Sequence, residues 1–154
     1  MNRQDDPKSL SLPKRSQLRL KAIATDLETS LPGIEQLSPV ALAYLGDAVY
    51  ELYLRTYYLL PPQRISAYHQ QVVAQARAER QADHLQALEV DLTETERDIL
   101  RRGRNAATRC PQRLSAAVYR QATSLETLIG YLYLTNPDRL NQLLAKLELD
   151  TLET

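Results

Sequence analysis

Residues 43–51 read Ala-Tyr-Leu-Gly-Asp-Ala-Val-Tyr-Glu and place a glycine and an aspartate, Gly46 and Asp47, inside a stretch with the pattern of a helix. Both residue types disfavour a helix interior, glycine by about 1 kcal/mol relative to alanine. A second helical stretch, at residues 124–134, has the same combination, because Glu126 stands one turn before Gly130. Two such helices could cross closely at the glycines and bring both carboxylates to one Mg²⁺ ion, which accepts one or two carboxylates and keeps several waters.

Helix signals predict an all-α fold of five helices after residue 33. Ser38 and Pro39 predict the start of a first helix that runs to about residue 60. Further helices are predicted at residues 64–88, 93–103, 115–134 and 137–149, the second of these beginning with a capping box at Thr93 and Glu96 and ending at Gly103. The residues expected in the core are Leu42, Leu45, Val49 and Leu52 of the first helix and Val118, Leu125, Leu128, Ile129 and Leu132 of the fourth.

Composition limits the class of protein. A chain of 154 residues fits one domain, and 19 basic residues against 19 acidic ones give a balance that indicates no partner. The single Cys110 excludes an internal disulfide and a multi-cysteine zinc site. The sequence has no long apolar run and no basic-then-apolar leader, so we expect a cytoplasmic protein without a membrane partner.

A local cluster of arginines is the main signal for binding of an anion. Five arginines and no acid occur within residues 101–113, namely Arg101, Arg102, Arg104, Arg109 and Arg113. After a helix that ends at Gly103, such a segment is a candidate helix-free loop that binds phosphates. The plain alternative is that these side chains are solvated or paired with nearby acids for little energy.

The two acidic stretches resemble motifs of a known family. Residues 42–51 are similar to the signature of the ribonuclease III family, and residues 126–132, Glu-Thr-Leu-Ile-Gly-Tyr-Leu, resemble its second acidic motif. The similarity is greater to Mini-ribonuclease III, a short bacterial branch that has the catalytic domain without a double-stranded-RNA-binding domain. Features of that branch are seen in His69, in residues 100–106 and in Tyr119-Arg120. The resemblance extends over about residues 34–149.

The resemblance implies a homodimeric, all-helical endonuclease domain that cuts double-stranded RNA and leaves 5′-phosphate and 3′-hydroxyl ends. Asp47 and Glu126 match the family's catalytic acids, and both would serve Mg²⁺. The larger enzymes of the family have further acids at the places of Val40, Ala43 and Thr123, so this chain has a smaller set of ligands.

For the short branch, the resemblance further implies maturation of the large-subunit (23S) ribosomal RNA precursor in the cytoplasm, with a ribosomal protein as a helper. The catalytic domain would be residues 34–150, preceded by a partly disordered extension at 1–33 and followed by a tail at 151–154. A-form RNA is read through phosphates and 2′-hydroxyls. The residues expected to make these contacts are Arg101, Arg102, Arg104 and Asn105.

Two other classes of function remain open from the sequence. A non-catalytic helical dimer could bind structured RNA through the arginines, and a helical scaffold could bind protein only. Binding by arginines weakens with salt and needs no Mg²⁺, whereas cleavage at two carboxylates requires the ion.

Overall fold

The computed structural model describes residues 33–150, and this part of the chain consists of helices and loops with no strand. The predicted all-α fold is confirmed. The predicted tail, and the predicted extension up to residue 32, lie outside the described part. No helix within residues 33–150 is long and apolar enough to span a membrane. The elements are η1 (Ile34–Gln36), α2 (Pro39–Tyr57), α3 (Ile65–Ala76), α4 (Ala78–Leu88), η2 (Glu89–Asp91), α5 (Glu94–Ala106), α6 (Ala116–Thr135) and α7 (Pro137–Leu144).

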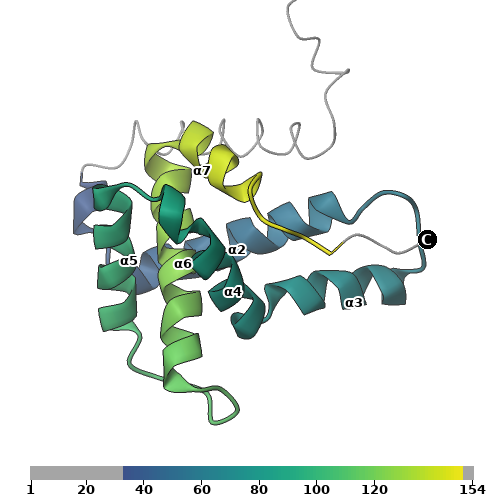
Figure 1. Ribbon diagram of the computed structural model, residues 1–154, viewed down its shortest axis with the longest axis horizontal. Coiled ribbons are helices and arrows are strands. Elements are labelled where there is room, and N and C mark those ends of the chain that lie inside the picture. The colour runs from purple at the N-terminus through teal and green to yellow at the C-terminus, as the bar shows by residue number, and fades with distance from the viewer. Residues whose placement is uncertain (1–32, 151–154) are drawn as a thin grey trace, which may run out of the picture.

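Helix α6 is the centre of the fold, with α2, α4, α5 and α7 packed around it (Figure 1). Ser115 caps its first turn by accepting a hydrogen bond from the Val118 N–H. Four of its five predicted core residues are buried, and Val118 is half-buried; the buried ones are Leu125, Leu128, Ile129 and Leu132. Helix α6 thus places Glu126 near the centre of the fold.

Two glycines allow α2 and α6 to cross with their backbones in contact. A Cβ atom on Gly46 would lie 1.7 Å from the carbonyl oxygen of Glu126, and one on Gly130 would lie 2.0 Å from the carbonyl oxygen of Leu42. No side chain fits at either position. The structure therefore contains the close crossing that the two glycine-containing stretches predict, and Asp47 follows directly on Gly46 at this junction.

The buried side of α2 differs from the predicted stripe. Leu42 and Val49 are buried as expected, but Leu52 is 42% exposed and Leu45 is half-buried. The side facing the core instead includes Gly46, Tyr50, Tyr53 and Leu54. Apolar periodicity missed this side because it gives weight to leucines, whereas a crossing glycine and tyrosines with bonded hydroxyls determine the orientation here.

The predicted helix at 64–88 is two helices, because the backbone of Arg77 is extended, with φ −62° and ψ 147°. No glycine or proline marks this break in the sequence. The side-chain amide of Gln81 bridges the break, because it donates a hydrogen bond to the carbonyl of Ala76, the last residue of α3, over 3.1 Å. The change of direction lets α4 pack on α6 while α3 lies along α2 (Figure 1).

The last predicted helix is also shorter, since α7 ends at Leu144 rather than near residue 149. The segment after it leaves the bundle and runs between α2 and α3 (Figure 1). There the Tyr58 hydroxyl donates to the Asp150 carbonyl, and the Gln75 amide donates to the Asp150 carboxylate, both over 2.8 Å. These tertiary hydrogen bonds favour an extended backbone over another helical turn.

Helix α5 begins as predicted and ends later. Thr93 and Glu96 form the predicted capping box. Gly103, predicted to stop the helix, lies inside it and is buried against α6, where a Cβ atom would come 2.5 Å from the Thr127 hydroxyl. The glycine serves close packing between helices rather than termination, and α5 continues to Ala106.

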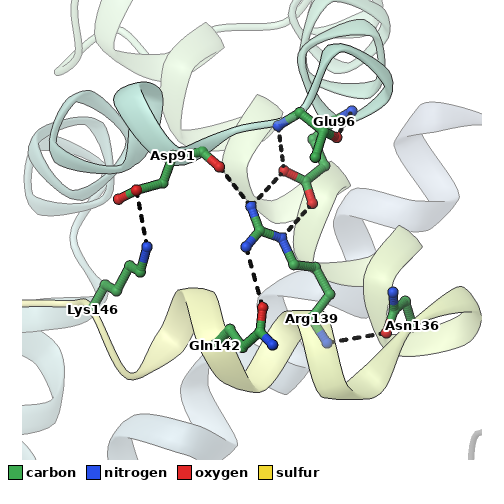
Figure 2. A network of polar contacts seen from close by, with 7 residues as sticks. Asp91, Glu96, Asn136, Arg139, Gln142 and Lys146 are labelled. Atoms are coloured by element: carbon green, nitrogen blue, oxygen red, sulfur yellow. Dashed lines mark hydrogen bonds and ion pairs between the residues drawn. The ribbon is translucent and has the colours of Figure 1, made fainter.

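Figure 2 shows how α7 is attached to the start of α5 and to η2. The guanidinium of Arg139 donates to both carboxylate oxygens of Glu96, over 2.7 and 3.1 Å, and to the carbonyl of Asp91 over 2.7 Å. Glu96 is buried, and its hydrogen bonds with Arg139 lower the pKa of its carboxyl. Lys146 pairs with Asp91 at the more exposed edge of the same network.

Replacement of Arg139 by methionine is expected to lower the free energy of unfolding by about 3 kcal/mol, because it leaves the Glu96 carboxylate buried without its cation. Urea denaturation measures the change. Lys146→Ala is the matched control, since its ion pair is about half exposed and is expected to contribute less than about 1 kcal/mol. Equal effects of the two variants would contradict a special role for the buried pair.

Candidate functional site

Asp47 of α2 and Glu126 of α6 line one open groove beside the helix crossing. Asp47 is exposed and Glu126 is partly buried, as the sequence predicts for Glu126. The other lining residues come from α2, from the end of α5 with the loop after it, and from α6; they are Val40, Ala43, Tyr44, Ala106, Ala107, Thr108, Arg109, Tyr119 and Thr123. The groove thus brings together the two acidic stretches and part of the arginine-rich segment.

The two carboxyl groups are electrostatically coupled. Burial and the neighbouring charge of Asp47 raise the pKa of Glu126 to about 7. Burial also raises the pKa of Asp47, with a further contribution from Glu51, while its hydrogen bond with Glu126 acts in the opposite direction. Below about pH 7, Glu126 therefore holds a proton that it can donate to Asp47. A cation that binds both oxygens would replace that proton and remove the repulsion.

This coupling predicts a pH dependence of folding for the metal-free protein. The folded-state pKa of Glu126, about 7, lies above its ordinary value of 4.5, so the folded protein binds the proton more tightly than the unfolded chain. The stabilisation is complete below pH 4.5 and is lost as pH rises to 7, with a slope of at most about 1.4 kcal/mol per pH unit. Urea denaturation of wild type and Glu126→Gln across this range measures the difference; parallel curves would contradict the assignment.

The residues present fit Mg²⁺. Within residues 33–150, no cluster of three or more His, Cys, Asp or Glu side chains is placed to hold a metal, but Mg²⁺ needs only one or two carboxylates and retains its waters. Val40, Ala43 and Thr123, the positions at which the sequence resemblance implies a smaller set of ligands, line the same groove. A coupled carboxyl pair in an open groove is a donor set suited to this hard ion.

The arginine-rich segment is divided between a helix and a loop. Arg101 and Arg102 lie in the helix predicted at residues 93–103, but the prediction of helix-free backbone after Gly103 is wrong for Arg104, because α5 extends to Ala106. Arg101 is ion-paired with Asp98 and exposed, and Arg102 is half-buried. Arg104 and Asn105 instead line a second groove together with Ala107, Thr108 and Arg120. We call this second groove the basic groove and the groove of Asp47 and Glu126 the acidic groove. Both include Ala107 and Thr108, so the two grooves are continuous.

The structure also places residues at the site that the sequence did not single out. Gln81 of α4 is buried, and its side-chain amide is close enough to lower the pKa of the Glu126 carboxyl. Its signal was present, since Gln81 shares an apolar face with Ala78, Ala82, Leu85 and Leu88. A polar residue within such a stripe indicates a buried partner.

Comparison with known proteins gives the family of this fold and groove. A profile of the Ribonuclease III domain matches residues 40–137, which include both acidic stretches. The chain belongs to the ribonuclease III family. As members of this family are endoribonucleases that act on double-stranded RNA, the protein-only scaffold and the non-catalytic RNA binder are the weaker interpretations.

Curated relatives place the chain in the Mini-ribonuclease 3 branch. It is 61% identical over 108 residues to Mini-ribonuclease 3 of Thermosynechococcus vestitus, an alignment that covers 70% of this chain and 72% of the relative. It is 56% identical to that of Synechocystis, over 77% and 82% of the two chains. A solved structure of a Fusobacterium nucleatum protein superposes with a TM-score of 0.68 at 30% identity and covers 75% of this chain and 95% of the other. The resemblance noted from the sequence is confirmed.

Proposed function

We propose that the chain cuts double-stranded RNA in a Mg²⁺-dependent reaction at the groove lined by Asp47 and Glu126. The observation that supports this most directly is the coupled carboxyl pair, whose members both have raised pKa values in a groove open to solvent. Structural carboxylates are usually paired with cations, as Glu96 is with Arg139. Repulsion between the two carboxylates destabilises the metal-free protein, and such a pair is suited to bind a cation that arrives with the substrate.

In this proposal Asp47 and Glu126 would hold Mg²⁺, which when bound would activate a water and neutralise charge on the phosphodiester. Asp47 is the more exposed of the two carboxyls. Glu126 would have to lose its proton for both carboxylates to hold the cation, and the cation competes with that proton, so cleavage should fall as pH drops below about 7. The products carry 5′-phosphate and 3′-hydroxyl ends.

The RNA lies across the basic groove, where Arg104 and Asn105 contact phosphates and 2′-hydroxyls, with Arg101 and Arg102 on the same helix as further contacts. Arg104→Ala is expected to weaken binding of double-stranded RNA several-fold and to reduce the slope of log K against log salt by about 1. Titrations at several salt concentrations measure both. Arg64→Ala, an exposed arginine before α3, is the control and should leave the slope unchanged.

The exposed side of α2 supports the proposal of a homodimer. Tyr44 is 85% exposed and Val40 is 59% exposed, and both line the edge of the acidic groove. A second copy seated on this side would cover these apolar groups and bring two grooves into one assembly, one for each RNA strand. Light scattering of wild type and Tyr44→Lys tests this, since the variant should shift the protein toward a monomer.

For the natural substrate we propose the precursor of large-subunit (23S) ribosomal RNA, matured in the cytoplasm with a ribosomal protein as a helper. The similarity to the Mini-ribonuclease 3 branch supports this proposal. The test is incubation of a stem from that precursor with the purified protein, in Mg²⁺ and in chelator, followed by mapping of the product ends. Cutting that chelator does not prevent, or 5′-hydroxyl products, would contradict the mechanism.

A further inference from the structure

Arg109 lines the acidic groove without being bound to either of its acids. It lies in the loop between α5 and α6 and is exposed, and it shares the groove with Asp47 and Glu126. Among residues 33–150, its guanidinium has no ion pair or hydrogen bond with a carboxylate. Its N–H donors are therefore available to an anion that enters the groove.

The arginines that line the two joined grooves differ in this respect from several arginines elsewhere. Arg104 of α5 and Arg120 of α6, which line the basic groove, also have guanidinium groups with no hydrogen bond or ion pair in the described part of the chain. Arginines outside these grooves that are held by protein oxygens are Arg55, Arg80, Arg97, Arg101 and Arg139. Unbound guanidinium groups from two helices and the loop between them thus lie along one continuous surface, which suits a backbone of regularly spaced phosphates.

The loop that carries Arg109 is fixed on both sides of it. Ala107, two residues before it, is buried. After it, the Cys110 thiol donates to the carbonyl of Leu114 over 3.3 Å, and the Leu114 N–H donates to the carbonyl of Pro111 over 3.1 Å. These contacts hold the backbone of Arg109 beside the acidic groove.

We propose that Arg109 is a catalytic residue for RNA cleavage: its guanidinium binds the non-bridging oxygens of the phosphate that is cut at Asp47 and Glu126. This inference rests on the proposed function of the acidic groove. Two carboxylates neutralise the charge of one Mg²⁺ ion, so a phosphodiester that enters the groove brings a negative charge that still lacks a partner. Among the described residues that line this groove, Arg109 is the basic one and supplies the balancing charge.

The chemistry of the step explains why this charge should act on the rate. In the proposed hydrolysis the oxygen of a water forms a bond to phosphorus, and the bond from phosphorus to the 3′-oxygen breaks. The water loses a proton and the 3′-oxygen takes one up as it leaves, so no other reactant is consumed. Because negative charge gathers on the oxygens around phosphorus, a guanidinium beside them stabilises the transition state more than the bound RNA.

The test compares Arg109→Ala with Arg113→Ala in the full chain. Arg113 belongs to the same loop and is also exposed, but it lines neither groove, and no contact with RNA is proposed for it. Both variants remove one positive charge from the loop, so their difference reports on the position in the groove. The measurements are kcat and KM on a double-stranded RNA stem, Mg²⁺ binding by calorimetry without RNA, and Tm.

We expect Arg109→Ala to lower kcat by about 100-fold, with KM for RNA within about threefold of wild type. Arg109→Lys keeps the charge without the planar fork and should recover about tenfold of that loss. Tm should not change, because the guanidinium has no protein partner to lose, and Mg²⁺ affinity should not fall, because a positive charge is removed. Arg113→Ala should keep kcat within about twofold of wild type.

Three results would overturn the inference. They are a wild-type kcat in Arg109→Ala, equal losses of kcat in the two alanine variants, and a loss of RNA affinity in Arg109→Ala with kcat unchanged. The last of these would make Arg109 a binding contact without a catalytic role.

A separate variant distinguishes failure of the inference from failure of the proposed function. If Asp47→Asn abolishes cleavage while Arg109→Ala cuts normally, only the role of Arg109 is wrong. If Asp47→Asn itself cuts at the wild-type rate, the proposed site is wrong and the role of Arg109 with it.

Discussion

Asp47→Asn is expected to reduce RNA cleavage by about 10³-fold or more, equivalent to about 4 kcal/mol of lost transition-state stabilisation. The substitution keeps the size and a hydrogen-bonding group but removes a charged oxygen from the proposed Mg²⁺ site. Single-turnover cleavage of a double-stranded RNA stem measures the effect. Cleavage within tenfold of wild type would contradict the assignment of Asp47.

The same variant should fold at least as well as wild type. Burial raises the pKa of Asp47, and Glu51 and Glu126 are close enough to influence it. Removing this charge relieves repulsion, so the free energy of unfolding without Mg²⁺ should stay the same or increase. RNA binding should also persist, because the contacts proposed for RNA come from α5. Loss of activity without loss of stability or binding would separate a chemical role from a structural one.

Glu51→Gln is the matched control for charge. Glu51 lies one turn after Asp47 on α2, but its carboxylate accepts a hydrogen bond from Arg55 over 2.7 Å. It also influences the pKa values of Asp47 and Glu126. If the Asp47 effect came only from the local charge, Glu51→Gln would show a comparable loss. We expect it to retain activity within about tenfold, since one distant charge contributes little beside a direct ligand.

The sequence predicted the part of the fold that depends on local signals. The caps at Ser38, Thr93 and Ser115 are made by side chains within three residues of the groups they bind, so a linear pattern contains them. The break at Arg77 is instead bridged by the hydrogen bond from Gln81 to the carbonyl of Ala76. The early end of α7 is accompanied by the hydrogen bond between Asp150 and Gln75, which is distant in the chain. No local residue type marks those positions.

The candidate site was predictable where its residues share a motif. The glycine-and-acid stretches indicated the crossing because glycine destabilises a helix interior unless close packing requires it. Here each of the two glycines packs against the backbone of the other helix. The grouping of Arg104 with Arg120 was not predictable, because the two arginines lie on separate helices that meet only through the packing of α5 on α6. Gly103 misled the interpretation of the arginines, since a glycine that ends a helix and one that packs against a neighbour look alike in sequence.

Gly46→Ala and Gly130→Ala are expected to lower the free energy of unfolding by about 3 kcal/mol or more, at or beyond the upper end of ordinary overpacking. The new methyl group would lie 1.7 Å from a backbone oxygen of Glu126 in the first case and 2.0 Å from one of Leu42 in the second. Backbone atoms within helices cannot move aside singly, so α2 and α6 would have to separate. Urea denaturation measures the loss, and any folded fraction should have lower activity because Asp47 and Glu126 move apart.

The sign of this effect makes the test decisive. Helix propensity alone predicts that Gly→Ala in a helix stabilises by about 1 kcal/mol, so stabilisation would contradict the close crossing and the meeting of the two acids that depends on it. Gly103→Ala is an internal comparison, since its methyl group would first meet the Thr127 hydroxyl, 2.5 Å away. The double variant Gly103→Ala/Thr127→Ala should recover part of the lost stability. No second substitution can rescue Gly46→Ala in this way, because the atom it strikes belongs to the backbone of Glu126.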